Sequence, residues 1–367
     1  MNVNRKAHTA VAGLITCVAA ATASAQPYIQ HVAQATAGAV SQVSIANLKP
    51  NWVVTAVCNS SGNLELGTWQ YANNALTLKS SAQASLAASK VAIADLSSSR
   101  VVTAHIDPNS NLVVEVWSIS STGAIGLEGG YIAEAASTVD IARLSSQRVV
   151  TAVRDSSGNL TLHVWGITSS GTVNSKGIVT DGAVSKASVT SMSSSQFVTA
   201  VQTSTGNLML SSWAVDSNGN ITYQADANKG TITQVDVTAW GAAGHVGTAA
   251  RNGSLNLEVL DWLVDPTTGS ITLQASKGGG AATKLAVSTI GTLIFTAAKD
   301  SSGKLSVGTW AYGGSTGTQF LEEASLEYDA ASIVAAAPLG SSTHSVTASV
   351  NGSGHLELNV WLYGVIH

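Results

Sequence analysis

The sequence predicts an all-β protein, a seven-bladed β-propeller with four-stranded blades, on three features of one repeat. A Thr-Ala pair recurs seven times, a tryptophan follows each threonine at one fixed interval, and a leucine stands five residues before each tryptophan. The threonines are Thr55, Thr103, Thr151, Thr199, Thr248, Thr296 and Thr347, and the tryptophans are Trp69, Trp117, Trp165, Trp213, Trp262, Trp310 and Trp361. A unit of about 48 residues repeated this regularly indicates a repeat architecture.

Turn residues between each threonine and the following leucine predict a β-hairpin. Residues 155–159 read Asp-Ser-Ser-Gly-Asn, and residues 148–153 before them are rich in β-branched side chains. Gly and Asn tolerate positive φ, and an Asp at the start caps such a turn. Because the spacing is constant, we expect the threonine and tryptophan to face each other across two strands, with the hydroxyl as a cross-strand hydrogen-bond partner.

Two further strands per copy complete a blade. Residues 139–144 form a typical first strand, and residues 271–275 a weaker fourth strand. The last copy ends soon after Trp361, with no room for a fourth strand, whereas residues 28–33 lie in phase with the fourth strands of the other copies. We therefore expect the N-terminal strand to pair with the last blade and close the ring, which removes an exposed sheet edge.

These repeat residues resemble the broad class of seven-bladed β-propeller repeat proteins along the whole mature chain. WD-repeat proteins use a similar closure, but their Gly-His and Trp-Asp pairs do not recur here, and Asp261-Trp262 has the reverse order. Quinoprotein propellers carry a turn before a tryptophan that residues 300–310 partly resemble, although most copies lack the lysine. The resemblance implies the fold and assigns no subfamily.

Residues 1–25 read as a signal peptide. Arg5 and Lys6 precede an apolar run at residues 10–21, and the small residues Ala23, Ser24 and Ala25 suit a signal peptidase. The run is shorter than the about 20 residues that a membrane helix needs. We expect cleavage after Ala25, one propeller domain over residues 26–367, no transmembrane segment after signal removal, and a periplasmic or secreted location.

Cysteine usage is consistent with this interpretation. Cys17 lies in the signal segment, and a lipoprotein cleavage box at residues 14–17 is the alternative, although Thr16 fits poorly before the cysteine. Cys58 alone cannot form an internal disulfide, even in an oxidising compartment. Stability is therefore expected to come from core burial and strand pairing.

The composition argues against several function classes. Charged residues make up 10% of the chain, against about 25% in an average soluble domain. The formal net charge is −4 and no basic stripe occurs, so nucleic acid is not an expected partner. Residues 216–220 come closest to a calcium loop but lack a following bidentate glutamate. We assign no metal site and no cofactor.

No catalytic residue is assigned from the sequence either. The histidines show no metal-ligand spacing, and His245 and His344, near the start of second strands, are interpreted as surface or edge residues. Aromatic faces stack on sugars, so the repeated tryptophans are a candidate lectin surface. Apolar or aromatic residues stand two positions after each one, however, which favours burial between blades.

Function is expected where the repeat varies. Near the ends of the first strands, one position reads Asn47, Asp95, Arg143, Ser191, Ala239, Thr289 and Ala335. First strands of propellers line the central channel, so we expect Asn47, Asp95, Arg143 and Ser191 to bind a ligand at its mouth. Asp95 and Arg143 come from neighbouring blades and are placed to pair or to hold a polar ligand. The alternative interpretation is a solvated channel rim.

The sequence thus favours an exported, non-catalytic binding or interaction module that presents a propeller face to a protein, glycan or small polar ligand. One alternative is an extracytoplasmic glycan-active enzyme, a hydrolase or lyase, with an asymmetric site at the channel mouth. Paired carboxylates about 5 to 10 Å apart there would favour glycoside hydrolysis. A structural or adhesive surface protein is the third hypothesis.

Overall fold

The computed structural model describes residues 26–241, 243–313, 319–340 and 343–366, and the regular elements in these ranges are all β-strands. The predicted signal peptide, residues 1–25, lies outside the described residues. None of the described ranges contains a helix that is long and apolar enough to cross a membrane.

The strands follow one another in chain order with short connections. They are β1 (Gln26–Lys49), β2 (Trp52–Asn59), β3 (Asn63–Ala72), β4 (Ala75–Ala87), β5 (Lys90–Ser97), β6 (Arg100–Ile106), β7 (Asn111–Ile119), β8 (Ile125–Ser145), β9 (Arg148–Asp155), β10 (Asn159–Ile167), β11 (Val173–Ser191), β12 (Gln196–Thr203), β13 (Asn207–Val215), β14 (Ile221–Ala239), β15 (His245–Asn252), β16 (Asn256–Val264), β17 (Ile271–Ala281), β18 (Lys284–Ile290), β19 (Leu293–Lys299), β20 (Lys304–Gly313), β21 (Gln319–Pro338), β22 (His344–Asn351) and β23 (His355–Ile366).

Each repeat copy forms the predicted antiparallel hairpin from its threonine strand and its tryptophan strand. In β9 and β10, Thr151 lies opposite His163 and Val149 lies opposite Trp165, and Gly158 takes a φ of 88° in the turn between them. The same register occurs in all seven copies. The residue directly opposite each tryptophan is the one two positions before the repeated threonine. The indole therefore reaches the threonine diagonally across the two strands.

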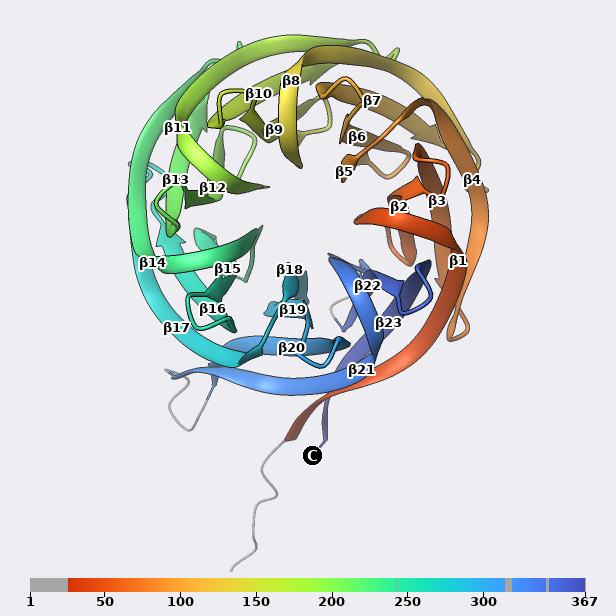
Figure 1. Ribbon diagram of the computed structural model, residues 1–367, viewed down its shortest axis with the longest axis vertical. Helices are drawn as coiled ribbons and strands as arrows, with labels where there is room; N and C mark the ends of the chain where they lie inside the picture. Colours follow the sequence, from red (N-terminus) through yellow and green to blue (C-terminus); the bar gives the residue numbers. More distant parts are fainter. Residues whose placement is uncertain (1–25, 242, 314–318, 341–342, 367) are drawn as a thin grey trace, which may run out of the picture.

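The sequence predicts separate strands for the outer edge of one unit and the inner edge of the next, but in five places the two are one continuous strand. Five strands (β1, β8, β11, β14 and β21) run from the perimeter of one unit to the inner edge of the next (Figure 1). In β8, Ala135 pairs with Asn111 of one unit and Ala136 pairs with Asp155 of the next. No glycine or proline turn separates the two parts, and a register shift between Ala136 and Thr138 accommodates the change of direction. Pairing is interrupted between β4 and β5 and between β17 and β18, which leaves a ten-stranded and a thirteen-stranded sheet.

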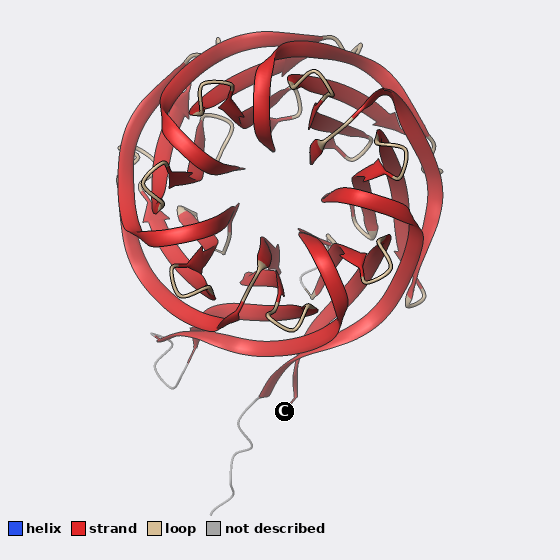
Figure 2. Ribbon diagram, viewed as in Figure 1, coloured by secondary structure: helices blue, strands red, loops and turns tan. Residues whose placement is uncertain are grey.

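The units lie around a central opening, with their first strands innermost (Figures 1 and 2). Residues 26–39 of β1 pair antiparallel with β23, with Ile29 opposite Tyr363, and residues 40–49 pair with β2. The beginning of the described chain thus lies beside its end.

The core consists of seven clusters, and each contains the tryptophan of one unit among apolar side chains of the unit before it. Trp165 packs with Val102 and Val114, for example, and Trp69 packs with Val346 and Leu358 of the last unit. All seven indoles are at most 2% exposed. Their interpretation as buried core residues is therefore confirmed.

Every one of these indoles donates a hydrogen bond to the repeated threonine of its own unit. The Nε1–Oγ1 distances run from 2.8 Å at Trp310 to 3.0 Å at Trp69. A buried N–H without a partner costs about 1–3 kcal/mol. The threonine thus satisfies the one polar atom of a large apolar side chain, as the sequence predicted for its hydroxyl.

Replacing Thr151 by valine tests this pairing. Thr151→Val keeps the shape but leaves Trp165 Nε1 buried without an acceptor, so we expect a loss of about 1–3 kcal/mol in unfolding free energy, measured by urea denaturation. In a Trp165→Phe background the same change removes no hydrogen bond and should cost much less. Equal costs in both backgrounds would show that the hydrogen bond contributes nothing.

Candidate functional site

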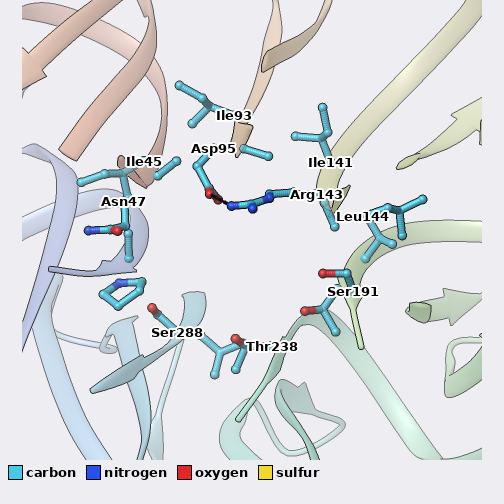
Figure 3. A pocket seen from close by; sticks show the side chains of 18 of the residues that line it. Ile45, Asn47, Ile93, Asp95, Ile141, Arg143, Leu144, Ser191, Thr238 and Ser288 are labelled. Atoms are coloured by element: carbon cyan, nitrogen blue, oxygen red, sulfur yellow. Dashed lines mark hydrogen bonds and ion pairs between the residues drawn. The ribbon is translucent and has the colours of Figure 1, made fainter. Parts of the chain in front are cut away.

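A cavity of about 510 Å³ lies where the first strands end, and residues of all seven units line it. The four residues singled out from the sequence are among them: Asn47 on β1, Asp95 on β5, Arg143 on β8 and Ser191 on β11 (Figure 3). Four positions spread over almost 150 residues of chain therefore meet at one mouth of the central opening, because each occupies the same register in its unit.

Asp95 and Arg143 form an ion pair across neighbouring units. Arg143 Nη1 donates to Asp95 Oδ2 at 2.6 Å, and the side chains are 42% and 37% exposed (Figure 3). The expectation that they pair is confirmed. Ion pairs this exposed contribute about 0–1 kcal/mol to stability. The remaining guanidinium N–H groups have no other partner among the described residues, so they are available to a ligand.

Asn47 and Ser191 add uncharged polar groups to the same cavity. Asn47 Nδ2 makes only long contacts of 3.4 Å with the carbonyl oxygens of Lys49 and Trp52. Within the described part of the chain, the Ser191 hydroxyl has no hydrogen-bond partner. These four residues therefore offer one cation, one anion, an amide and a hydroxyl, a set suited to a neutral polar or zwitterionic group.

The strand register shows that one of the seven residues assigned to the variable position near the ends of the first strands, Ala335, was assigned wrongly. Asn47 pairs with Val53, two residues before the repeated threonine. The residue in the same relation to Thr347 is Pro338, which pairs with Ser345, and not Ala335. In the last unit the residue at this position therefore lies three residues later than the sequence spacing suggested.

Deeper on the inner strands, two carboxyl groups meet one serine. Ser188 Oγ on β11 lies 2.8 Å from Asp140 Oδ2 on β8 and 2.7 Å from Asp236 Oδ1 on β14. Each carboxyl group also accepts a backbone N–H from a neighbouring inner strand, Val189 for Asp140 and Val287 for Asp236, both at 2.8 Å. Inner strands pair on one side only, so these carboxyl groups satisfy edge N–H groups that face the opening.

Protonation of this group follows from its geometry. Burial, reinforced by the charge of Asp236, raises the pKa of Asp140 to about 6. Burial likewise raises the pKa of Asp236. A serine hydroxyl has a single hydrogen, so both short contacts are satisfied when one carboxyl group is protonated and donates to Ser188 Oγ. Sequence reasoning missed the group, although an aspartate between apolar residues in a strand was a visible signal.

A third polar group surrounds Asp261, which is fully buried on β16. Its carboxylate accepts hydrogen bonds from Trp240 Nε1 at 2.9 Å and from the Tyr312 hydroxyl at 2.8 Å. His245 Nδ1 lies 3.0 Å from both carboxylate oxygens. Burial of Tyr312 and its hydrogen bond to Asp261 raise the pKa of the Tyr312 hydroxyl. The carboxylate thus fixes the orientation of one histidine and two aromatic rings.

His245 and Trp240 line a cavity of about 300 Å³ that shares Met192 with the cavity at the mouth. The histidine side chain is 24% exposed. With Nδ1 held by Asp261, Nε2 is the ring atom left for a ligand, an arrangement that suits a general base or a hydrogen-bonding group. His245 lies at an edge, as the sequence suggested, but its buried partner was missed. The signal was Asp261 itself, at a position where other copies have Thr, Ser or Val.

Comparisons with known proteins rest on structure alone, since no family model and no curated protein matches this chain. The WD40 domain of Toxoplasma gondii coronin aligns with a TM-score of 0.60 and 12% identity, over 92% of this chain and 86% of that one. The periplasmic gluconolactonase of Pseudomonas aeruginosa aligns at 0.57 and 14%, over 78% and 85%. A putative 6-phosphogluconolactonase of Bacteroides fragilis aligns at 0.56 and 10%, over 79% and 87%.

This chain has a β-propeller fold. At these identities the similarity extends to the fold and not to chemistry. The propeller of this chain therefore has to be assigned a function from its own side chains.

The turn that came closest to a calcium loop in the sequence is held by its own hydrogen bonds. Asp216 Oδ1 accepts the backbone N–H groups of Asn218 and Asn220, and Oδ2 accepts Asn220 Nδ2 at 2.7 Å. The carboxylate closes the turn. Across the described residues of the propeller, no cluster of three His, Cys, Asp or Glu side chains has the arrangement of a metal site.

The carboxyl pair gives a pH dependence with a defined sign. Because the folded pKa of Asp140 is raised to about 6, the folded state binds more protons than the unfolded state between about pH 4 and 6. Stability should therefore fall as pH rises through that window and level off above it. The loss should be roughly 1–3 kcal/mol, since one pKa unit corresponds to about 1.4 kcal/mol.

Chemical denaturation of Asp140→Asn and of the exposed control Asp329→Asn at several pH values measures this loss. In the Asp140 variant, the unfolding free energy should change little between pH 4 and 6. In the control it should fall over this range as it does in the unmodified protein. An unchanged decline in Asp140→Asn would rule out the shared proton.

Proposed function

We propose that this protein is an exported, non-catalytic binding module whose ligand, a small polar molecule, occupies the cavity at the channel mouth. The observation that carries the proposal is the exposed ion pair of Asp95 and Arg143 inside a cavity of about 510 Å³. Ligand cavities of proteins typically measure about 300–1,000 Å³ and hold a few convergent polar groups. Asn47 and Ser191 supply two more such groups on the same arc.

The scaffold in this proposal is one domain, residues 26–367, formed by seven blades in a ring that the N-terminal strand closes. Two observations support closure: residues 26–39 of β1 pair with β23, and Trp69 packs against the last unit as the other tryptophans pack against theirs. A rigid ring holds the four polar side chains at fixed separations, which lowers the entropic cost of binding.

Export rests on the sequence of residues 1–25 and on the fold. The charged start, apolar run and small residues before Gln26 support removal of a signal peptide. A periplasmic gluconolactonase with a similar fold supports a propeller in that location. The buried Cys58 needs no disulfide partner, and burial raises its pKa to about 11, which protects it from oxidation.

An enzyme is the second candidate, and His245 is the observation that favours it. A histidine oriented by a buried aspartate beside a cavity has the arrangement of a general base. Two of the structurally similar proteins have lactonase names, so hydrolysis is the reaction class to test. At the channel mouth itself, Asp95 is the one acidic residue among the described lining residues, and it is paired with Arg143.

A thermal-shift screen of sugars, amino acids and small carboxylic acids against the mature chain tests the proposal, with Arg143→Gln, Arg143→Lys and His245→Gln beside it. We expect a stabilising ligand whose affinity falls about tenfold or more in Arg143→Gln, because charge-assisted hydrogen bonds contribute about 1.5–3 kcal/mol. Arg143→Lys should retain part of the affinity, and His245→Gln should bind normally.

Three outcomes would contradict the proposal. Unchanged affinity in Arg143→Gln would move the ligand away from the channel mouth. Turnover of the ligand that disappears in His245→Gln would replace the binding module with the enzyme. A screen without any stabilising compound would favour the structural or adhesive hypothesis.

A further inference from the structure

The opposite end of the channel has a different character. A cavity of about 310 Å³ lies where the first strands begin, and three lysines line it: Lys90 on β5, Lys186 on β11 and Lys284 on β18. On β11, Lys186 stands five residues before Ser191, which corresponds to about 17 Å of strand. This cavity is therefore separate from the one in the proposed function.

The three lysines converge because they occupy one register position. Lys90 pairs with Ile106, Lys186 with Gln202 and Lys284 with Lys299, in each case three residues after the repeated threonine. The same position holds Gln42, Thr138 and Gln234 in the intervening units, and these also line the cavity. Cationic and uncharged polar side chains thus alternate around six of the seven units.

The lysines have no acidic partner among the described residues of this cavity. The described residues that line the cavity include no Asp or Glu, and none of the three ammonium groups has an ion pair or hydrogen bond within the described ranges. The chain as a whole carries a formal charge of −4. Three unpaired cations on one cavity in an acidic protein repel one another.

Two further observations support mutual repulsion. Burial, together with the charges of Lys284, Lys90 and Arg154, lowers the pKa of Lys186. The guanidinium of Arg154 is held nearby, where its Nε donates to the Val184 carbonyl oxygen at 2.7 Å. The positive field at this end therefore extends beyond the three lysines.

We propose that this cavity is a second binding site, for a small polyvalent oxyanion held by Lys90, Lys186 and Lys284. The alternating Gln42, Thr138 and Gln234 supply neutral hydrogen-bonding groups between the cations. The ligand carries several negative charges on phosphate or carboxylate groups, since three separated ammonium groups match charge distributed around a compact molecule. A volume of about 310 Å³ admits a small molecule and not a folded polymer.

Isothermal titration calorimetry of the mature chain with pyrophosphate and with citrate tests this site. We expect one molecule bound per chain, and an affinity about tenfold weaker or more in Lys186→Gln and weaker again in Lys186→Gln/Lys284→Gln. Lys186→Arg should retain binding. Lys304→Gln, which removes an exposed lysine beside Glu327, is the matched control and should bind normally.

Preference for one probe identifies the anionic group, phosphate or carboxylate. A second measurement is the melting temperature without anion in low salt, which Lys186→Gln should raise because one like charge is removed. Absence of binding by both anions at millimolar concentration, or unchanged binding in the double variant, overturns the site. Equal weakening in Lys304→Gln overturns it as well, because the attraction would then be non-specific. None of these outcomes depends on Arg143 or on the ligand at the other mouth.

Discussion

The structure depends on one interaction repeated seven times, a buried indole that donates to the threonine of its own unit while it packs against the unit before. The hydrogen bond fixes the direction of the ring, and the apolar surface then holds two units together. Because the described residues form no disulfide and few ion pairs, these contacts supply much of the cohesion between units. Trp69 packs in the same way against Val346 and Leu358 of the last unit.

This arrangement leaves the inner strands free to vary. Perimeter strands and indoles set the register, so side chains at equivalent inner positions meet at the centre whatever their chemistry. One inner position gives the lysines at one end, and the position two residues further along gives Asp140, Ser188 and Asp236. Another position gives Asp95 and Arg143 at the opposite mouth. Function in such a scaffold is encoded by departures from the repeat.

Sequence reasoning predicted what depends on period and on local chemistry. The fold class, the hairpins, the buried tryptophans and the Asp95–Arg143 pair all follow from fixed spacing. The continuous strands such as β8 were not predicted, because the absence of a turn signal is weaker evidence than its presence. The hydrogen bonds around Asp261 and Asp140 connect residues of different units. The repeat spacing does not specify which side chains are long enough to meet across the interface between two units, so these contacts were not predicted. Ala335 was misplaced by three residues, and only the pairing of Pro338 with Ser345 identifies the correct position.

Hydrogen exchange of the indole Nε1–H groups, followed by two-dimensional ¹⁵N NMR, tests the central claim most directly. We predict that the seven repeated indoles exchange only through global unfolding, and that Trp69 is as strongly protected as Trp165. Trp52, which donates no hydrogen bond through Nε1 among the described residues, is the internal reference and should exchange faster. A Trp69 indole that exchanges orders of magnitude faster than Trp165 would contradict the account, since the first and last units would then separate while the rest stays folded.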